Sequence, residues 1–159
     1  MISKEVLDSL NKLGIALAAK PNFPIPSLPR DISDMDDEGL MDLFVQFTSW
    51  SDYLSGARAI AVINEREAER LVTNREADEF LNQWKGGSAD RIALVKAKVA
   101  SEPEVADAKY DLDTKYAFRK LLETRADDVE RNSQVVSREL TRRTSGISGI
   151  RSRKDSFRI

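Results

Sequence analysis

Apolar residues recur at steps of three and four positions along most of this chain, which is the period of an α-helix with one buried face. The first such segment covers residues 1–20, where Val6, Leu10 and Leu13 keep the spacing. The other segments with this spacing cover residues 33–84, 91–100 and 103–143. The pattern therefore predicts an all-α protein.

The breaks between these segments consist of proline and glycine. Four of the five prolines fall between Pro21 and Pro29, which predicts an extended linker over residues 21–32. This stretch is either a stiff spacer or a strap that lies on a helix or on another subunit. Gly86 and Gly87 predict a turn. Residues 33–143 are therefore predicted to form a long helical hairpin domain, preceded by an N-terminal helix over 1–20.

Helix start signals support these boundaries. Ser33 precedes acidic residues that favour the first turn of a helix, and Ser101 with Glu104 forms the pattern of a capping box. The helix that starts near Ser33 would hold roughly 50 residues and reach about 70 Å. Because one small core cannot cover such a face, a partner is expected to cover it. Gly56, in its middle, is interpreted as a point of close packing.

The heptads of the last helix are apolar at both ends and interrupted by Lys115 and Arg119 near the middle. Such a seam is typical of a coiled-coil-like hairpin that associates with further subunits. The aromatic residues of the second segment are interpreted as core or as subunit contact. The predicted oligomer interface consists of Phe44, Phe47, Trp50, Leu54, Leu122, Val129, Val136 and Leu140.

The composition argues against catalysis. Cysteine and histidine are both missing from the sequence, which removes thiolate chemistry, the commonest general base and the commonest metal ligand. The carboxylates alternate with arginines, as in ion pairs on exposed helix faces, and no phosphate-binding glycine loop or calcium loop is present. We therefore expect a non-enzymatic protein without cofactor or metal. The apolar stretch near the N-terminus, residues 13–19, is too short for a membrane span, so a cytoplasmic location is expected.

Charge is divided unevenly along the chain. Residues 141–159 hold six cations and one acid, a net charge of +5, so the rest of the chain carries −7 within the total of −2. An acidic body with a basic tail indicates a polyanionic partner. The tail, predicted to be flexible from 144 to 159, either binds nucleic acid or is an unstructured terminus that keeps the protein soluble. The candidate DNA-binding cations of residues 141–159 are Arg142, Arg143, Arg151, Arg153, Lys154 and Arg158.

A second positive run surrounds the predicted turn. It contains no acid between Arg91 and Ala100, and it suits a DNA strand as well as it suits a plain charged helix surface. Its candidate DNA-binding residues are Lys85, Arg91, Lys96 and Lys98.

The order of these features resembles the UvsY-type recombination mediators of tailed phages over about residues 31–150. The resemblance is carried by Asp31-Ile32-Ser33, Trp50 and Leu54, the charged run 64–70, Gly86-Gly87, Arg91, Lys96-x-Lys98-Val99, Ser101, Val105, and the helix from Tyr116 through Leu121-Leu122 to Arg138. In that family the segment before the turn is rich in lysine and arginine and binds DNA. Here residues 73–78 keep only Arg75, which is the candidate DNA-binding residue of this segment.

The resemblance implies a homo-oligomeric ring, heptameric in the family, that binds single-stranded DNA without enzymatic activity. It also implies that the protein helps a RecA-like recombinase to replace a single-strand-binding protein. The alternative is a phage structural or assembly protein, such as a connector, adaptor or scaffold, that acts through helical oligomerisation. In that case Ile147, Ile150, Phe157 and Ile159 of the tail would insert into a neighbour.

Overall fold

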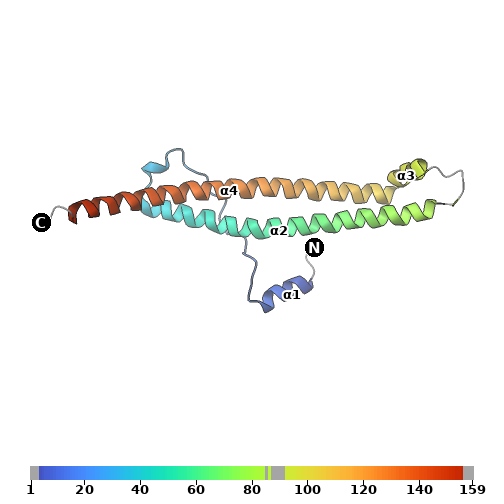
Figure 1. The fold of residues 1–159 in the computed structure, drawn as a ribbon, viewed down its shortest axis with the longest axis horizontal. Helices are drawn as coiled ribbons and strands as arrows, with labels where there is room; N and C mark the ends of the chain where they lie inside the picture. Colours follow the sequence, from blue (N-terminus) through green and yellow to red (C-terminus); the bar gives the residue numbers. More distant parts are fainter. Residues whose placement is uncertain (1–3, 85, 87–91, 156–159) are drawn as a thin grey trace. The chain divides into compact units, whose positions relative to one another are not determined.

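The computed structural model of the protein describes the backbone of residues 4–84, 86 and 92–155. Within these ranges it contains helices and no strand, which confirms the predicted all-α class (Figure 1). The elements are α1 (Lys4–Lys12), the 3₁₀ helix η1 (Ile32–Asp34), α2 (Asp37–Gln83), α3 (Ile92–Ser101) and α4 (Pro103–Asp155).

The chain divides into two compact units. The first comprises Met1–Ala16 and Ala57–Glu123, and the second comprises Leu17–Gly56 and Thr124–Ile159. Each unit contains a part of α2 and a part of α4, which lie side by side and antiparallel (Figure 1). The predicted pairing of two long helices is therefore confirmed within each unit.

Helix α1 ends earlier than its apolar pattern predicts, at Lys12 instead of Lys20. Gly14, with a φ of +71°, follows the helix, and its N–H donates to Asn11 O at 3.0 Å while Ile15 N–H donates to Leu10 O at 3.0 Å. These two bonds form a Schellman motif, which glycine permits because it adopts positive φ without strain. Leu13 is left 73% exposed.

The start of α2 depends on Asp36, not on Ser33. Asp36 Oδ1 accepts a hydrogen bond from Gly39 N–H at 2.8 Å, and its carbonyl accepts one from Leu40 N–H at 3.0 Å, so Asp36 is the N-cap. A Cβ on Gly39 would lie 2.8 Å from that Oδ1, which explains the glycine. Ser33 lies in η1, where its N–H donates to Asp31 Oδ1 at 3.1 Å.

Helix α4 begins where the sequence predicts, but without the predicted capping box. Ser101 ends α3 and donates its hydroxyl to Lys98 O at 2.8 Å, so it does not cap α4. Glu102 O accepts the N–H of Ala106 at 2.9 Å, and Pro103 occupies the first helical position. Proline is suited to this position because its fixed φ is helical and its missing N–H has no partner there.

In the second unit, the parts of α2 and α4 bury each other's apolar face. Phe47 and Val136 are fully buried, and the core also contains Leu40, Leu43, Trp50, Leu54 and Val129. The predicted oligomer interface is therefore wrong for Phe47, Trp50, Leu54, Val129 and Val136, which α2 and α4 of one chain cover. Phe44, Leu122 and Leu140 are half-buried. The physical reason is that α4 supplies the partner that the long face of α2 requires.

In the first unit, small residues line much of the pairing between α2 and α4. Ala61, Ala68 and Ala108 are buried there. Helix α3 adds a separate apolar cluster of Val95 and Val99 with Val105 of α4, against which Phe80 packs. This cluster fixes α3 at the end of α2. Gly56, in the second unit, is in ordinary contact range of Leu17, since a Cβ would lie 3.6 Å from its Cδ2.

The charged interruption of the seam is a cross-helix ion pair of the first unit. Arg119 donates to both carboxylate oxygens of Glu65, which is only 8% exposed, and its Nη1 donates to Glu123 Oε1 at 2.8 Å. These hydrogen bonds raise the pKa of Arg119 and lower the pKa of Glu123. Because slipping the helices would leave these charges unpaired, the pair specifies the register of α2 against α4.

The backbone of α4 continues to Asp155, so the prediction of a flexible tail from residue 144 is wrong for residues 144–155. The segment contains no proline, and adding a turn to an existing helix costs much less than nucleating one. Glycine lowers helix stability by about 1 kcal/mol per residue but does not stop a helix. Among the described residues, no helix is both long enough and apolar enough to cross a membrane.

Core burial predicts unequal effects of two leucine truncations in α2. Leu54 is 4% exposed and Leu81 is 72% exposed. We expect Leu54→Ala to lower the free energy of unfolding by about 2–5 kcal/mol and Leu81→Ala to change it by less than about 1 kcal/mol. Urea denaturation followed by circular dichroism measures both, and equal losses would contradict the assignment of Leu54 to the core.

The cross-helix pair predicts non-additive mutations. Glu65→Leu and Arg119→Leu should each lower the melting temperature, because each leaves a poorly solvated charge without its partner. The double variant should lose less than the sum of the two, since it removes both charges. Thermal melts of the four proteins complete the cycle. Strict additivity would show that the two side chains do not interact.

Candidate nucleic-acid interface

An apolar groove of about 590 Å³ lies in the first unit, between the last turns of α2 and α3. Its lining residues are Thr73, Glu76, Ala77, Phe80 and Leu81 of α2, and Lys96 and Val99 of α3. The groove exists because Val95 and Val99 hold α3 against Val105 and Phe80. The two helices thus present an apolar floor with a lysine among its walls.

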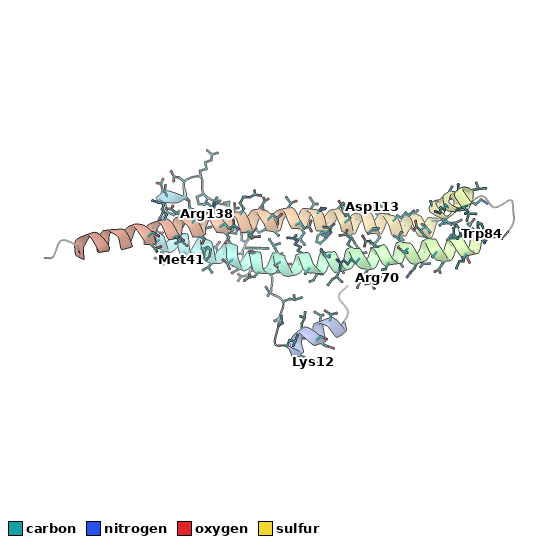
Figure 2. All side chains as sticks on the ribbon, in the orientation of Figure 1. Lys12, Met41, Arg70, Trp84, Asp113 and Arg138 are labelled. Carbon is teal, nitrogen blue, oxygen red and sulfur yellow. The ribbon has the colours of Figure 1, made fainter. Side chains whose placement is uncertain are left out.

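An aromatic pair continues from this floor to the end of α2. Phe80 and Trp84 stack with ring centroids 5.7 Å apart and an interplanar angle of 17°. Trp84 N–H donates to Phe80 O at 3.0 Å, which continues the helical pattern past Gln83. Trp84, which Figure 2 labels at the end of α2, is 39% exposed, so it offers ring surface to a flat ligand. Sequence reasoning missed this pair, although a spacing of four residues just before a glycine turn signals it.

The charge at the groove is set by its neighbours. Glu76, the acid that lines the groove, forms an ion pair with Lys109, whose Nζ lies 2.7 Å from Glu76 Oε1. This pair neutralises the charge of Glu76. Among the ion pairs of the part of the chain that the structure describes, none involves Lys96 or Lys98, and both side chains are exposed. Both lysines therefore remain available to an anion. The candidates Lys85 and Arg91 lie outside the described residues.

Arg75 does not join this groove. It forms an exposed ion pair with Glu104 across α2 and α4, in the first unit. Exposed pairs of this kind contribute little stability because water and salt screen them. Arg75 can therefore exchange this partner for a phosphate at little cost, but it lies outside the groove.

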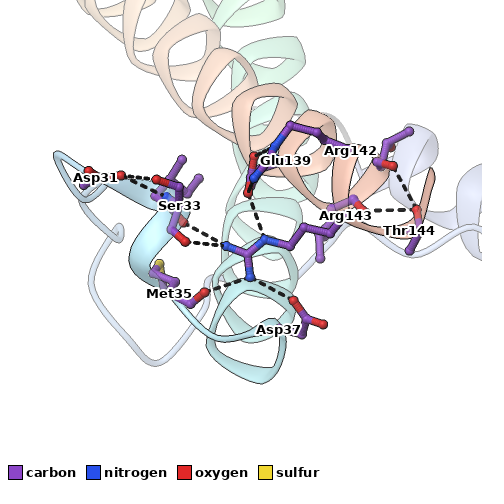
Figure 3. A network of polar contacts seen from close by, with 11 residues as sticks. Asp31, Ser33, Met35, Asp37, Glu139, Arg142, Arg143 and Thr144 are labelled. Carbon is purple, nitrogen blue, oxygen red and sulfur yellow. Dashed lines mark hydrogen bonds and ion pairs between the residues drawn. The ribbon is translucent and has the colours of Figure 1, made fainter. Parts of the chain in front are cut away.

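Arg143, a predicted DNA-binding residue, is part of the structure of the second unit (Figure 3). Its Nη1 donates to Met35 O at 2.7 Å and to Asp37 Oδ1 at 2.8 Å, and its Nη2 donates to Ser33 O at 3.0 Å. Its side chain is 17% exposed. Arg143 thus ties α4 to η1 and to the first turn of α2, and its assignment to DNA is corrected for this reason.

Glu139 joins the arginines of this network on the α4 side. Its carboxylate accepts hydrogen bonds from Arg142 Nη2 at 2.6 Å and from Arg143 Nε at 2.8 Å. These hydrogen bonds lower the pKa of Glu139 to about 2, and the bonds from Arg142 have the largest effect. Glu139 was not singled out in the sequence, although arginines three and four positions after a glutamate favour such pairs on a helix. Arg142 keeps 66% of its side chain exposed and remains a candidate for a phosphate contact.

The remaining candidate cations lie farther along the chain. Arg151, Arg153 and Lys154 belong to α4, whose backbone the structure describes there. Arg158 lies outside the described residues. Within the residues that the structure describes, no group of three or more carboxylates is placed to hold a metal ion.

Comparisons with protein-family models, with curated proteins and with solved structures find no match to this chain.

The low pKa of Glu139 predicts a pH dependence of stability. Its folded-state pKa of about 2 lies below the ordinary 4.5, so its contribution is complete above pH 4.5 and is lost as the pH falls to about 2. Glu139→Gln should therefore destabilise the protein most above pH 4.5, and the difference from wild type should shrink toward pH 2. Urea denaturation across this range measures the difference, with Glu130→Gln as an exposed control in α4. A pH-independent difference would contradict the proposed pairing.

Proposed function

We propose that this protein binds single-stranded DNA without enzymatic activity and assists the loading of a RecA-like recombinase. The observation that carries the DNA-binding part is the groove between α2 and α3. It combines an apolar floor, the exposed ring of Trp84 stacked on Phe80, and the exposed lysine Lys96.

This combination suits unpaired nucleotides. Bases of single strands stack on aromatic side chains with a gain of about 1–3 kcal/mol per base and little sequence preference. Lysines beside the aromatic ring attract the phosphates, and this attraction weakens as salt increases. Lys96 supplies such a charge at the groove, and the lining of the groove offers no competing carboxylate except Glu76, which is paired with Lys109.

The C-terminal cations supply a second set of phosphate contacts. Arg142, Arg151, Arg153, Lys154 and Arg158 give this end of the chain its positive charge. The role in recombination rests on the resemblance to UvsY-type mediators, and it includes a ring-shaped homo-oligomer and exchange of a single-strand-binding protein.

The second candidate function is that of a phage structural or assembly protein. It is favoured by large apolar side chains left exposed on α4, since Tyr110 is 76%, Phe118 60% and Leu121 74% exposed. Exposed apolar patches mark surfaces that bind other proteins. Protein contact and DNA binding require different residues, so mutations can separate the two functions.

Tryptophan fluorescence tests the groove directly. Trp50 is buried and its indole N–H has no hydrogen-bond partner, so Trp50→Phe provides a background in which only Trp84 reports. Oligo(dT) should quench Trp84 at low salt. Lys96→Gln should weaken binding and reduce the slope of log affinity against log salt by about one.

The matched control is Arg131→Gln, which removes one positive charge from an exposed site of α4. It should leave the quenching of Trp84 unchanged. The proposed function is wrong if, at low salt, single-stranded DNA does not quench the fluorescence of Trp84 and the protein does not retard the DNA in electrophoresis.

The tail distinguishes the two candidate functions. Changing Arg151, Arg153 and Arg158 to glutamine should weaken binding of oligo(dT) if these cations hold phosphates, because each loss removes a counterion-releasing contact. The same change should spare assembly if the protein is structural. Light scattering with and without the oligonucleotide measures both properties in one sample.

A further inference from the structure

Helix α4 carries a second stripe on the face opposite its buried seam. Within the first unit, Tyr110, Thr114, Ala117 and Leu121 follow one another at steps of four, three and four residues, and all four are exposed. The inner seam of α4 just before this stretch includes Val105 and Ala108, which are both buried, and Val105 packs with valines of α3. The outer stripe has no such cover among the described residues.

The spacing of this stripe is that of a helix seam made for another helix. Steps of three and four residues place side chains along one line, and alternation of large with small residues lets two helices interdigitate. Tyr110 and Leu121 are the large members, whereas Thr114 and Ala117 between them allow close approach. An occupant with the matching pattern is a second copy of the same stripe.

Charges on one flank decide the direction of that second copy. Asp113 and Lys120 each precede a stripe residue by one position, and a separation of seven residues places them on the same flank of α4. In an antiparallel pair, equal flanks face each other, so Asp113 of each copy meets Lys120 of the other. In a parallel pair this flank would meet the opposite flank, where Phe118 lies, and would gain no ion pair.

The existing contacts of these residues are compatible with such a pairing. Lys120 reaches Glu123 at 3.4 Å while remaining 52% exposed, and its Nζ lies 5.9 Å from the centre of the Tyr116 ring. Asp113 is exposed as well. On the opposite flank, Phe118 of one copy would lie near Asp111 of the other, whose carboxylate is already paired with Lys115. No uncompensated charge is therefore buried.

We propose that a second copy of this chain docks antiparallel on the outer stripe of α4, about a two-fold axis. Tyr110 packs on Leu121 of the second copy, and Thr114 packs on Ala117. Two ion pairs between Asp113 and Lys120 flank the contact. Because both copies use the same surface, the contact closes at two subunits. It goes beyond the proposed function, since neither DNA nor a ring is needed to form it.

Charge reversal in the full-length protein tests this contact. Sedimentation equilibrium of the wild type without DNA should show association into dimers, whether or not larger assemblies also form. Asp113→Lys and Lys120→Asp should each raise the dissociation constant roughly tenfold or more, because each places like charges opposite each other twice. The double variant Asp113→Lys/Lys120→Asp should restore dimerisation, since it exchanges the two partners. Asp52→Lys, on the exposed surface of α2, is the control for a single reversal and should leave the mass unchanged.

A second variant tests the apolar part of the contact. Leu121 is 74% exposed, so Leu121→Glu should keep the helical circular dichroism of the monomer and abolish dimerisation. Three outcomes would overturn the proposal: a wild type that stays monomeric at high concentration, an assembly whose mass Leu121→Glu leaves unchanged, or a double reversal no better than the singles. The same variants are expected to bind oligo(dT) in the groove as the wild type does. Failure of the dimer contact can therefore be told apart from failure of the proposed function.

Discussion

The mutual burial of α2 and α4 is the interaction on which the rest of the structure depends. Leu40, Phe47, Leu54, Ala61 and Ala68 follow each other at seven-residue intervals along α2, and all are buried. A helix with such a face is not stable in water without a partner, because most helical stability in proteins comes from packing of the apolar face. The chain supplies this partner itself in both units. The inner faces are therefore closed, and any further molecule must bind the outer faces.

Polar residues on the paired faces give this packing its register and its ends. Glu65 and Arg119 meet in the first unit, where small alanines would by themselves allow the helices to slide. Arg143 joins η1, Asp37 and Glu139 in the second unit. Arg143 resembles a nucleic-acid ligand in the sequence, but its donors are occupied by carboxylates and carbonyls of the same chain. Lys96 and Lys98 have no such ion pair among the described residues and remain available to an anion.

The outer surface offers two kinds of contact that differ in chemistry. The groove beside Phe80 and Trp84 combines aromatic rings with Lys96, which is suited to unpaired bases and phosphates. The outer stripe of α4 is apolar at its centre and carries Asp113 and Lys120 at its flank, which is suited to a copy of itself. The two proposed contacts share no residue, so neither proposal requires the side chains of the other.

The sequence by itself determined the helices and most of their boundaries. Periodicity identified α2, α3 and α4, and Pro103 marked the first residue of α4, because these signals act within a few residues of chain. Local signals failed at two helix ends. Asp36, and not Ser33, caps α2, and the turn at Gly14 ends α1 earlier than its apolar pattern predicts. Only the tertiary structure decided which apolar faces the chain closes by itself and which arginines are occupied. Those outcomes depend on contacts between residues far apart in sequence, such as Arg119 with Glu65 and Arg143 with Asp37, which no local pattern records.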